Sequence, residues 1–200
     1  MNINPDYAAA YNNWGIALSN LKKYEEAVEK YKKATEINPE NDLAHYNLAS
    51  TLQTKGDIDG AIGEYKEAIR IKPDNATYHN DLGVILHNKD DIDGAIKEYQ
   101  IALDRVPRFA LAHSNIALSF QKKGWHDMAI KEFRAALEID PTSAARTHYY
   151  IGKAFHEKGD LDAAITEYNE ALRLDPNLAD AYVDLGNALR SKQQSAPTPD

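Results

Sequence analysis

Apolar residues recur along this chain with the spacing of amphipathic helices. Trp14 and Leu18, and then Ala27, Tyr31 and Ala34, follow one another at intervals of three or four residues. This spacing places each group on one face of a helix. A polar break separates the two groups, and a proline follows the second group. This proline is expected to end the second helix, because proline cannot continue a helical hydrogen-bond ladder. The pattern predicts a pair of short helices that is closed by a proline.

The pair of helices repeats along the chain. The hexapeptide Asp-Ile-Asp-Gly-Ala-Ile occurs at 57–62 and again at 91–96. Its first aspartate is suited to cap the start of a second helix, and the glycine Gly56 before it is suited to end the first. Six prolines, separated by intervals of 34 residues and a last interval of 35, mark the period: Pro5, Pro39, Pro73, Pro107, Pro141 and Pro176. Because one hairpin cannot bury its apolar face alone, this period predicts stacked helical hairpins.

Two further columns of residues keep the same period. One column holds a small residue in each first helix: Gly15, Ala49, Gly83, Ala117, Gly152 and Gly186. The other holds an aromatic residue in each second helix: Tyr31, Tyr65, Tyr99, Phe133 and Tyr168. A small residue allows two helix axes to approach closely, and an aromatic ring fills the space that is left. We expect the two columns to meet inside each hairpin.

With these columns the sequence resembles a tetratricopeptide repeat (TPR) array, whose pattern extends over 34 residues and ends in proline. The resemblance implies an all-α fold, an α-solenoid of antiparallel helix hairpins that forms a right-handed superhelix with a concave groove. Five full repeats are expected, with the end of a truncated preceding repeat before them and a capping helix and a disordered tail after them. The corresponding ranges are 1–7, 8–41, 42–75, 76–109, 110–144 (with a linker lengthened near Ala144), 145–178, 179–190 and 191–200.

Composition and charge restrict the partners. The chain has 200 residues, a formal net charge of −8 and interspersed acidic and basic residues, so we expect neither nucleic acid nor an anionic membrane as partner. It contains no cysteine, which excludes disulfides and thiolate sites. No apolar run has the length of a membrane span, and the first residues lack the pattern of a secretion signal. We therefore expect a cytoplasmic protein.

In this family the first helices line the concave groove, so their residues outside the core are the expected peptide-binding site. Asn13, Asn47 and Asn115 lie in one column, similar to the asparagine ladder in the repeat region of a glycosyltransferase. An amide both donates and accepts, so such a ladder can bind an extended peptide backbone. The alternative is that these polar residues only keep an exposed helix face solvated. The candidate groove residues are Asn12, Asn13, Tyr46, Asn47, Ser50, Asn80, Asp81, Val84, Ser114, Asn115, Leu118, Tyr149, Tyr150 and Lys153.

A histidine column could suggest a metal site: His45, His79, His113 and His148. Equivalent residues of stacked hairpins are too far apart to share one ion, since helix axes pack roughly 8–10 Å apart and zinc ligands bind at about 2 Å. We expect hydrogen-bonded histidines in the packing interface, and neither a metal nor another cofactor. The sequence has no phosphate-binding loop, no HExxH motif and no nucleophile motif, so we expect no catalytic residue and no enzyme.

Three functions are compatible with these features. The first is a protein-interaction scaffold that binds an extended peptide or a partner helix in the groove. The second is self-association through the N-terminal end, because the apolar side chains of Tyr11, Trp14 and Leu18 lack a preceding hairpin. The third is the substrate-recruiting segment of a larger enzyme such as a glycosyltransferase. The identity of the partner does not follow from the fold, because one scaffold serves many functions.

Overall fold

The computed structural model describes residues 5–195, with side chains for 7–194, and the chain divides into two compact units, with the division after Arg105. The described residues form eleven α-helices and one short 3-10 helix, and they contain no strand. The all-α prediction is therefore confirmed. None of the helices in this part of the chain is both long enough and apolar enough to cross a membrane.

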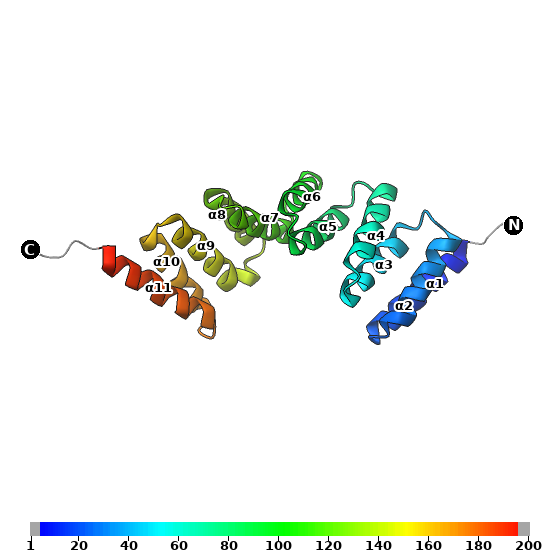
Figure 1. The fold of residues 1–200 in the computed structure, drawn as a ribbon, viewed down its shortest axis with the longest axis horizontal. Helices are drawn as coiled ribbons and strands as arrows, with labels where there is room; N and C mark the ends of the chain where they lie inside the picture. The colour runs from blue at the N-terminus through cyan, green and yellow to red at the C-terminus, as the bar shows by residue number, and fades with distance from the viewer. Residues whose placement is uncertain (1–4, 196–200) are drawn as a thin grey trace, which may run out of the picture. The chain divides into compact units, whose positions relative to one another are not determined.

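Unit 1 is built from three helical hairpins (Figure 1). Within each hairpin the two helices pack along each other, and α2 and α4 then pack against the first helix of the next hairpin. The helices are α1 (Pro5–Asn20), α2 (Tyr24–Ile37), α3 (Asp42–Lys55), α4 (Ile58–Ile71), α5 (Ala76–Asn88) and α6 (Ile92–Arg105). The stacked hairpins that the sequence predicts are present in this unit.

Unit 2 is built from two hairpins and one further helix. Helix α8 packs against α9, and α10 packs against α11, so the stacking rule is the same as in unit 1. The extra residue of the last linker lies beside a 3-10 turn that begins at Pro141. The elements are α7 (Ala110–Lys122), α8 (His126–Ile139), η1 (Pro141–Ser143), α9 (Ala144–Lys158), α10 (Leu161–Leu174) and α11 (Ala179–Ser195).

The turn inside the second hairpin shows why Asp-Ile-Asp-Gly-Ala-Ile recurs. Gly56 ends α3 in the left-handed conformation, with φ of 85°, which a residue without a Cβ adopts at little cost. Asp57 then caps α4, because its side chain accepts a hydrogen bond of 3.1 Å from the backbone N–H of Gly60. In the next repeat the Asp91 side chain accepts the equivalent bond from Gly94, at 3.0 Å. Both expected roles of the turn residues are confirmed.

Each first helix has three faces, set by the helical period of 3.6 residues. In α3 the stacking face points toward the preceding hairpin and is buried: Ala44, Leu48 and Thr51. Its hairpin face points toward α4 and is also buried: His45, Ala49 and Leu52. A third face of α3 is half-buried or exposed and contains Tyr46, Asn47 and Ser50. These three names are used below for the equivalent residues of the other first helices.

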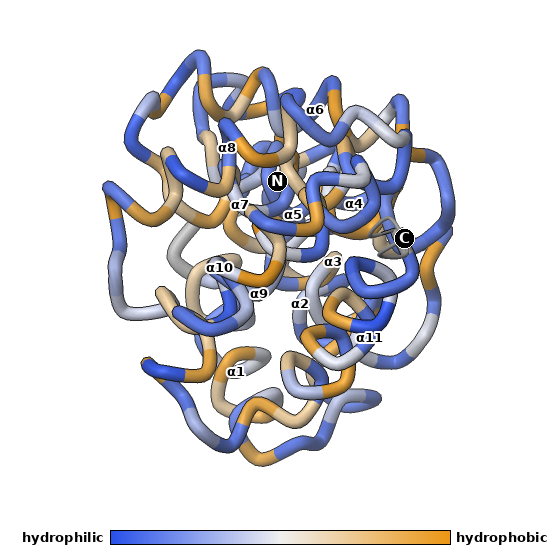
Figure 2. The backbone as a smooth tube through the Cα atoms, turned by 90° about the vertical axis from the view of Figure 1, so that its left-hand side faces the viewer, coloured by the Kyte–Doolittle hydropathy of each residue, from blue (hydrophilic) through white to orange (hydrophobic). Residues whose placement is uncertain are grey.

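The small and aromatic columns meet on the hairpin face, as the sequence predicts. A Cβ placed on Gly15 would lie only 2.6 Å from the Tyr31 ring, and one on Gly83 would lie 2.6 Å from the Tyr99 ring. One buried cluster, which includes Leu18, Tyr31, Leu48, Tyr65 and Leu82, runs through the hairpins of unit 1. Hydrophobic and hydrophilic segments accordingly alternate along the helices (Figure 2).

The two ends of the chain depart from the expected ranges. Residues 1–4 of the expected truncated repeat lie outside the described residues, while Pro5 to Tyr7 begin α1. Proline is favourable there because the first helical position needs no N–H donor. The expected tail at 191–200 is wrong for 191–195, which continue α11. No proline or glycine interrupts the sequence before Pro197, so nothing stops the helix at residue 190. Residues 196–200 lie outside the described residues.

The N-terminal face also differs in part from the expectation. Trp14 is 52% exposed and Tyr11 is half-buried, but Leu18 is only 6% exposed. Leu18 lies on the hairpin face of α1 and packs in the buried cluster with Ala27 and Tyr31. It does not belong to the uncovered surface.

Candidate functional site

All of the candidate groove residues lie on the third faces of first helices. In unit 1 they come from α1, α3 and α5, and in unit 2 from α7 and α9. Asn13 and Ser50 are exposed, whereas Asn12 and Asn80 are buried, at 6% and 4% exposure. The other members are half-buried. The side chains of Asn12 and Asn80 therefore face neighbouring protein groups more than solvent.

Hydrogen bonds join the third faces of successive repeats in unit 1. The Asn47 amide donates to Asn12 Oδ1 at 2.9 Å, and the Tyr46 hydroxyl donates to Asp81 Oδ2 at 2.8 Å. The Asn80 amide donates to Asp81 Oδ1 at 2.9 Å. In each bond between helices the partners are 35 residues apart, which is one repeat plus one residue. The third faces of α1, α3 and α5 are thereby held in a fixed arrangement.

The same link occurs in unit 2. The Tyr149 hydroxyl donates to Asp184 Oδ2 on α11 at 3.0 Å. Tyr150 stacks on the ring of Phe133 with the centroids 5.6 Å apart, and it also contacts Tyr149. Tyr150 therefore replaces the asparagine of this column with a ring that makes aromatic contacts.

Tyr46 is the centre of the third face in unit 1. Its ring stacks on Tyr78 at a centroid distance of 4.8 Å and lies 5.8 Å from the ring of Tyr65. Burial, followed by the hydrogen bond to the Asp81 carboxylate, raises the pKa of the Tyr46 hydroxyl well above its usual value. The hydroxyl therefore remains a donor, and this part of the third face presents aromatic carbon beside amide groups.

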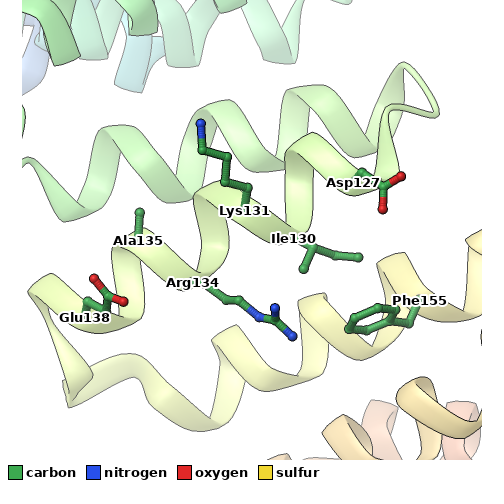
Figure 3. A pocket seen from close by; sticks show the side chains of 7 residues that line it. All are labelled: Asp127, Ile130, Lys131, Arg134, Ala135, Glu138 and Phe155. Atoms are coloured by element: carbon green, nitrogen blue, oxygen red, sulfur yellow. The ribbon is translucent and has the colours of Figure 1, made fainter.

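A pocket of about 470 Å³ lies between α8 and α9 in unit 2 (Figure 3). Arg134 points toward Phe155, with its guanidinium carbon 5.8 Å from the ring centroid, and Lys131 points the other way. The lining residues are Asp127, Ile130, Lys131, Arg134, Ala135, Glu138 and Phe155. Two acids and two bases give the pocket no dominant charge, and no candidate groove residue lines it.

The histidine column lies in the interface inside the four hairpins that begin with α3, α5, α7 and α9, as expected. His45, His79 and His113 each place Nδ1 within 2.6–2.7 Å of a glutamate that follows 19 residues later, and Nε2 at 3.0 Å from the carbonyl oxygen of the proline near the end of the preceding repeat. His148 bonds to Glu167 in the same way, at 2.7 Å. The glutamate partners were not predicted from the sequence, although they form a column of their own: Glu64, Glu98, Glu132 and Glu167.

The histidines do not gather around a common point. Among the residues that the structure describes, no group of three or more histidines and carboxylates could hold a metal ion. Each imidazole is instead directed at its own glutamate. The chemistry of the third faces is accordingly that of hydrogen bonding and apolar contact, carried by amide, hydroxyl, aromatic and aliphatic groups.

Sequence families and solved structures agree with this architecture. The family model described as TPR repeat matches residues 17–56, 53–90 and 152–193, and the one described as tetratricopeptide repeat matches residues 110–143. A search of curated proteins gave no match.

Several solved structures have the same fold at low sequence identity. The MamA protein is 23% identical, with 97% of this chain and 99% of that chain covered and a TM-score of 0.80. YrrB, described as a TPR protein with an unusual peptide-binding site, is 24% identical, with coverages of 95% and 94% and a TM-score of 0.78. TTC0263, a thermophilic TPR protein of Thermus thermophilus, is 23% identical, with coverages of 91% and 98% and a TM-score of 0.63.

At these identities the structural likeness establishes the fold alone. The family assignment rests on the repeat model, which matches more than half of the chain, and on the small and aromatic columns that the structure brings together. The chain belongs to the tetratricopeptide repeat proteins, an α-solenoid family of protein-interaction scaffolds.

Proposed function

We propose that this protein is a non-enzymatic scaffold whose third faces bind an extended peptide segment or a partner helix of another protein. The observation that carries the proposal is the hydrogen-bonded row on α1, α3 and α5, in which Asn47 bonds to Asn12 and Tyr46 bonds to Asp81. These bonds fix the side chains before any ligand arrives. A surface fixed in advance loses less conformational entropy on binding.

The side chains of this row still have hydrogen-bonding groups that can bind a peptide. The Asn47 amide has two N–H donors and a carbonyl oxygen, and one N–H bonds to Asn12, so an approaching peptide backbone finds both a donor and an acceptor. Asn13 and Ser50 are exposed beside it, and Val84 adds half-buried aliphatic surface. Since Asp81 is the only charged candidate residue of unit 1, the preferred ligand of this row is an extended segment of low charge.

The resemblance to YrrB supports a peptide as ligand, since that protein is described as having a peptide-binding site. We carry over only the class of ligand. The residues proposed to contact the peptide are those of the hydrogen-bonded row on α1, α3 and α5.

The test is selection of peptides from a displayed random library, followed by calorimetry of the selected peptides with two matched variants. Ser50→Arg places a long charged side chain on the third face of α3. Gly63→Arg places the same side chain on an exposed position of α4 that has no atom within 4 Å of an added Cβ. We expect Ser50→Arg to weaken binding by about tenfold or more and Gly63→Arg to leave it unchanged.

A second substitution tests the amide itself. Asn47→Ala should weaken peptide binding by about 1 kcal/mol, because it removes a hydrogen bond to the peptide backbone. Equal affinities of the parent protein and Ser50→Arg would show that the peptides bind elsewhere. Failure to select any peptide would remove the proposal for this class of ligand.

A further inference from the structure

Among the described residues, no second helix packs on the hairpin face of α11. In the complete hairpins this face receives an aromatic ring: a Cβ on Gly152 would lie 2.8 Å from the ring of Tyr168. Gly186 occupies the equivalent position of α11, and a Cβ placed there would meet no atom within 4 Å. Beside it, Tyr182 is 55% exposed and Leu189 is 44% exposed. These three residues form an apolar socket with a glycine at its centre.

The opposite side of α11 is firmly packed. Ala181 and Ala188 are fully buried, and Leu185 packs against the cluster that contains Tyr168. Helix α11 is therefore held on α10 and presents its hairpin face outward. An exposed apolar stripe on a helix that is fixed in this way marks an interaction surface.

The chain itself shows which kind of helix fits such a socket. Every second helix carries an aromatic residue with an alanine four residues before it and another three residues after it, as in Ala27, Tyr31 and Ala34. All members of this pattern are buried against a first helix. A helix with an exposed copy of the pattern would be a suitable partner for Gly186.

The stacking face of α1 is an exposed copy of this pattern. Ala10, Trp14 and Ala17 have the spacing of Ala27, Tyr31 and Ala34, and all three are exposed. Tyr7 and Leu21 extend the apolar stripe at its two ends and are 62% and 69% exposed. The opposite side of α1 packs on α2 and α3, so the helix is held with this stripe outward.

The residue before the aromatic ring is a second feature in which α1 and α11 match each other. In the hairpins where a first helix carries histidine, the residue before the ring is a glutamate that bonds to it, as Glu64 does to His45. At the position of the histidine, α11 carries Tyr182, which offers no cation to a glutamate. In α1 the residue before Trp14 is the neutral Asn13, whose amide is a suitable partner for a phenol hydroxyl.

We propose that two copies of this chain associate head to tail, with the Trp14 stripe of α1 in one copy packed as a second helix on the Gly186 socket of α11 in the other. The two surfaces are different, so the contact is heterologous, and each added copy leaves one free end. Trp14 supplies the large ring, and Gly186 supplies the close approach that the other glycines of this column supply to tyrosine. The proposal does not depend on peptide binding by the third faces.

The test measures molar mass by sedimentation equilibrium between about 1 μM and about 1 mM, a range in which weak association is detectable. Trp14→Gln removes the ring, and Gly186→Gln fills the socket without a clash inside the chain. The matched controls are Trp125→Gln, at another exposed tryptophan, and Gly63→Gln, at another open helical glycine. We expect the parent protein and both controls to form species larger than a dimer, and each of the two test variants alone to be monomeric.

The decisive sample is an equimolar mixture of the two test variants. Trp14→Gln keeps an intact socket and Gly186→Gln keeps an intact stripe, so the mixture should form a dimer and nothing larger. Association of Gly186→Gln alone would indicate that α1 pairs with α1, and association of Trp14→Gln alone would indicate that α11 pairs with α11. Either result overturns the proposal, as does a monomeric parent protein at the highest concentration. Circular dichroism of all variants confirms that they are folded.

Discussion

His79 is held by two acceptors, which makes the stability of the hairpin dependent on pH. Its Nδ1 lies 2.7 Å from Glu98 Oε2, and its Nε2 lies 3.0 Å from the carbonyl oxygen of Pro73. A carbonyl and a carboxylate only accept hydrogen bonds, so both ring nitrogens donate when the imidazole is protonated. The hydrogen bond to Glu98 has the largest effect and raises the pKa of His79, whereas burial lowers this pKa. The Pro73 carbonyl and the charge of Glu98 raise the pKa further, and the charge of Arg105 lowers it. The net direction is upward.

The sign of the pH dependence follows from this direction. The pKa of His79 is higher in the folded than in the unfolded chain, so its contribution is fully present below the unfolded value of about 6.5. The contribution is lost as the pH rises through the folded pKa. His45 behaves alike, because its bond to Glu64 raises its pKa, burial opposes this, and the Pro39 carbonyl adds to the rise. The free energy of unfolding should therefore fall above pH 6.5, by at most about 1.4 kcal/mol per pH unit for each histidine.

Glu98→Gln isolates one of these pairs. The side chains of His79 and Glu98 are only 6% and 19% exposed, so the loss of this charge-assisted bond at pH 6 should cost about 1.5–3 kcal/mol. Above the folded pKa of His79 the cost should shrink, because the neutral imidazole gains less from a carboxylate. The assay is urea unfolding followed by circular dichroism at pH 6, 7, 8 and 9, with Glu138→Gln on the exposed side of α8 as control. If Glu98→Gln kept the pH slope of the parent protein, the imidazolium account would be wrong.

Two further pairs of variants test the packing and the turns by urea unfolding. Tyr168→Phe should stabilise the protein by about 1 kcal/mol, because the buried hydroxyl has no hydrogen-bond partner among the described residues. Tyr65→Phe should not stabilise it, because that hydroxyl donates to Gln53 at 3.0 Å; equal effects of the two would contradict the argument. Lys22→Gly should stabilise by about 1 kcal/mol, because Lys22 has φ of 59°. Gly56→Ala, at φ of 85°, should destabilise the protein by a similar amount. If the urea midpoint of unfolding were unchanged in both Lys22→Gly and Gly56→Ala, the argument from backbone conformation would be refuted.

The hairpins could be predicted from the sequence because their causes are local. Proline at the end of a second helix, glycine at the end of a first helix and aspartate at the next start each act within a few residues of the chain. The meeting of Gly15 with Tyr31 was also predictable, since only one register brings a small column to an aromatic column. The continuation of α11 through 191–195 was not, because no residue there marks an end and helix boundaries then depend on weak propensities.

The third faces could be located but not described from the sequence. The period assigns Asn12, Asn47 and Asn80 to them, yet it does not say that Asn12 and Asn80 are buried. The bonds from Asn47 to Asn12 and from Tyr46 to Asp81 depend on the distance and angle between neighbouring hairpins. The repeat pattern of the sequence identifies these residues but does not specify the distance and angle between neighbouring hairpins. The histidine–glutamate pairs are different, because each glutamate follows its histidine by a constant 19 residues, an interval that can be read from the sequence.

The two proposed interactions use different faces of the same type of helix. At 100° per residue, the centres of the stacking, hairpin and third faces lie roughly 120° apart. On α1 the stacking face carries Trp14, the hairpin face carries Gly15 and the third face carries Asn13. A peptide on the third faces of α3 and α5 therefore leaves the Trp14 stripe and the Gly186 socket accessible, because Asn13, the third-face residue that the head-to-tail contact also uses, lies on α1. Saturation with a selected peptide should leave the association constant of the head-to-tail contact unchanged, and a large shift would mean that the two surfaces overlap.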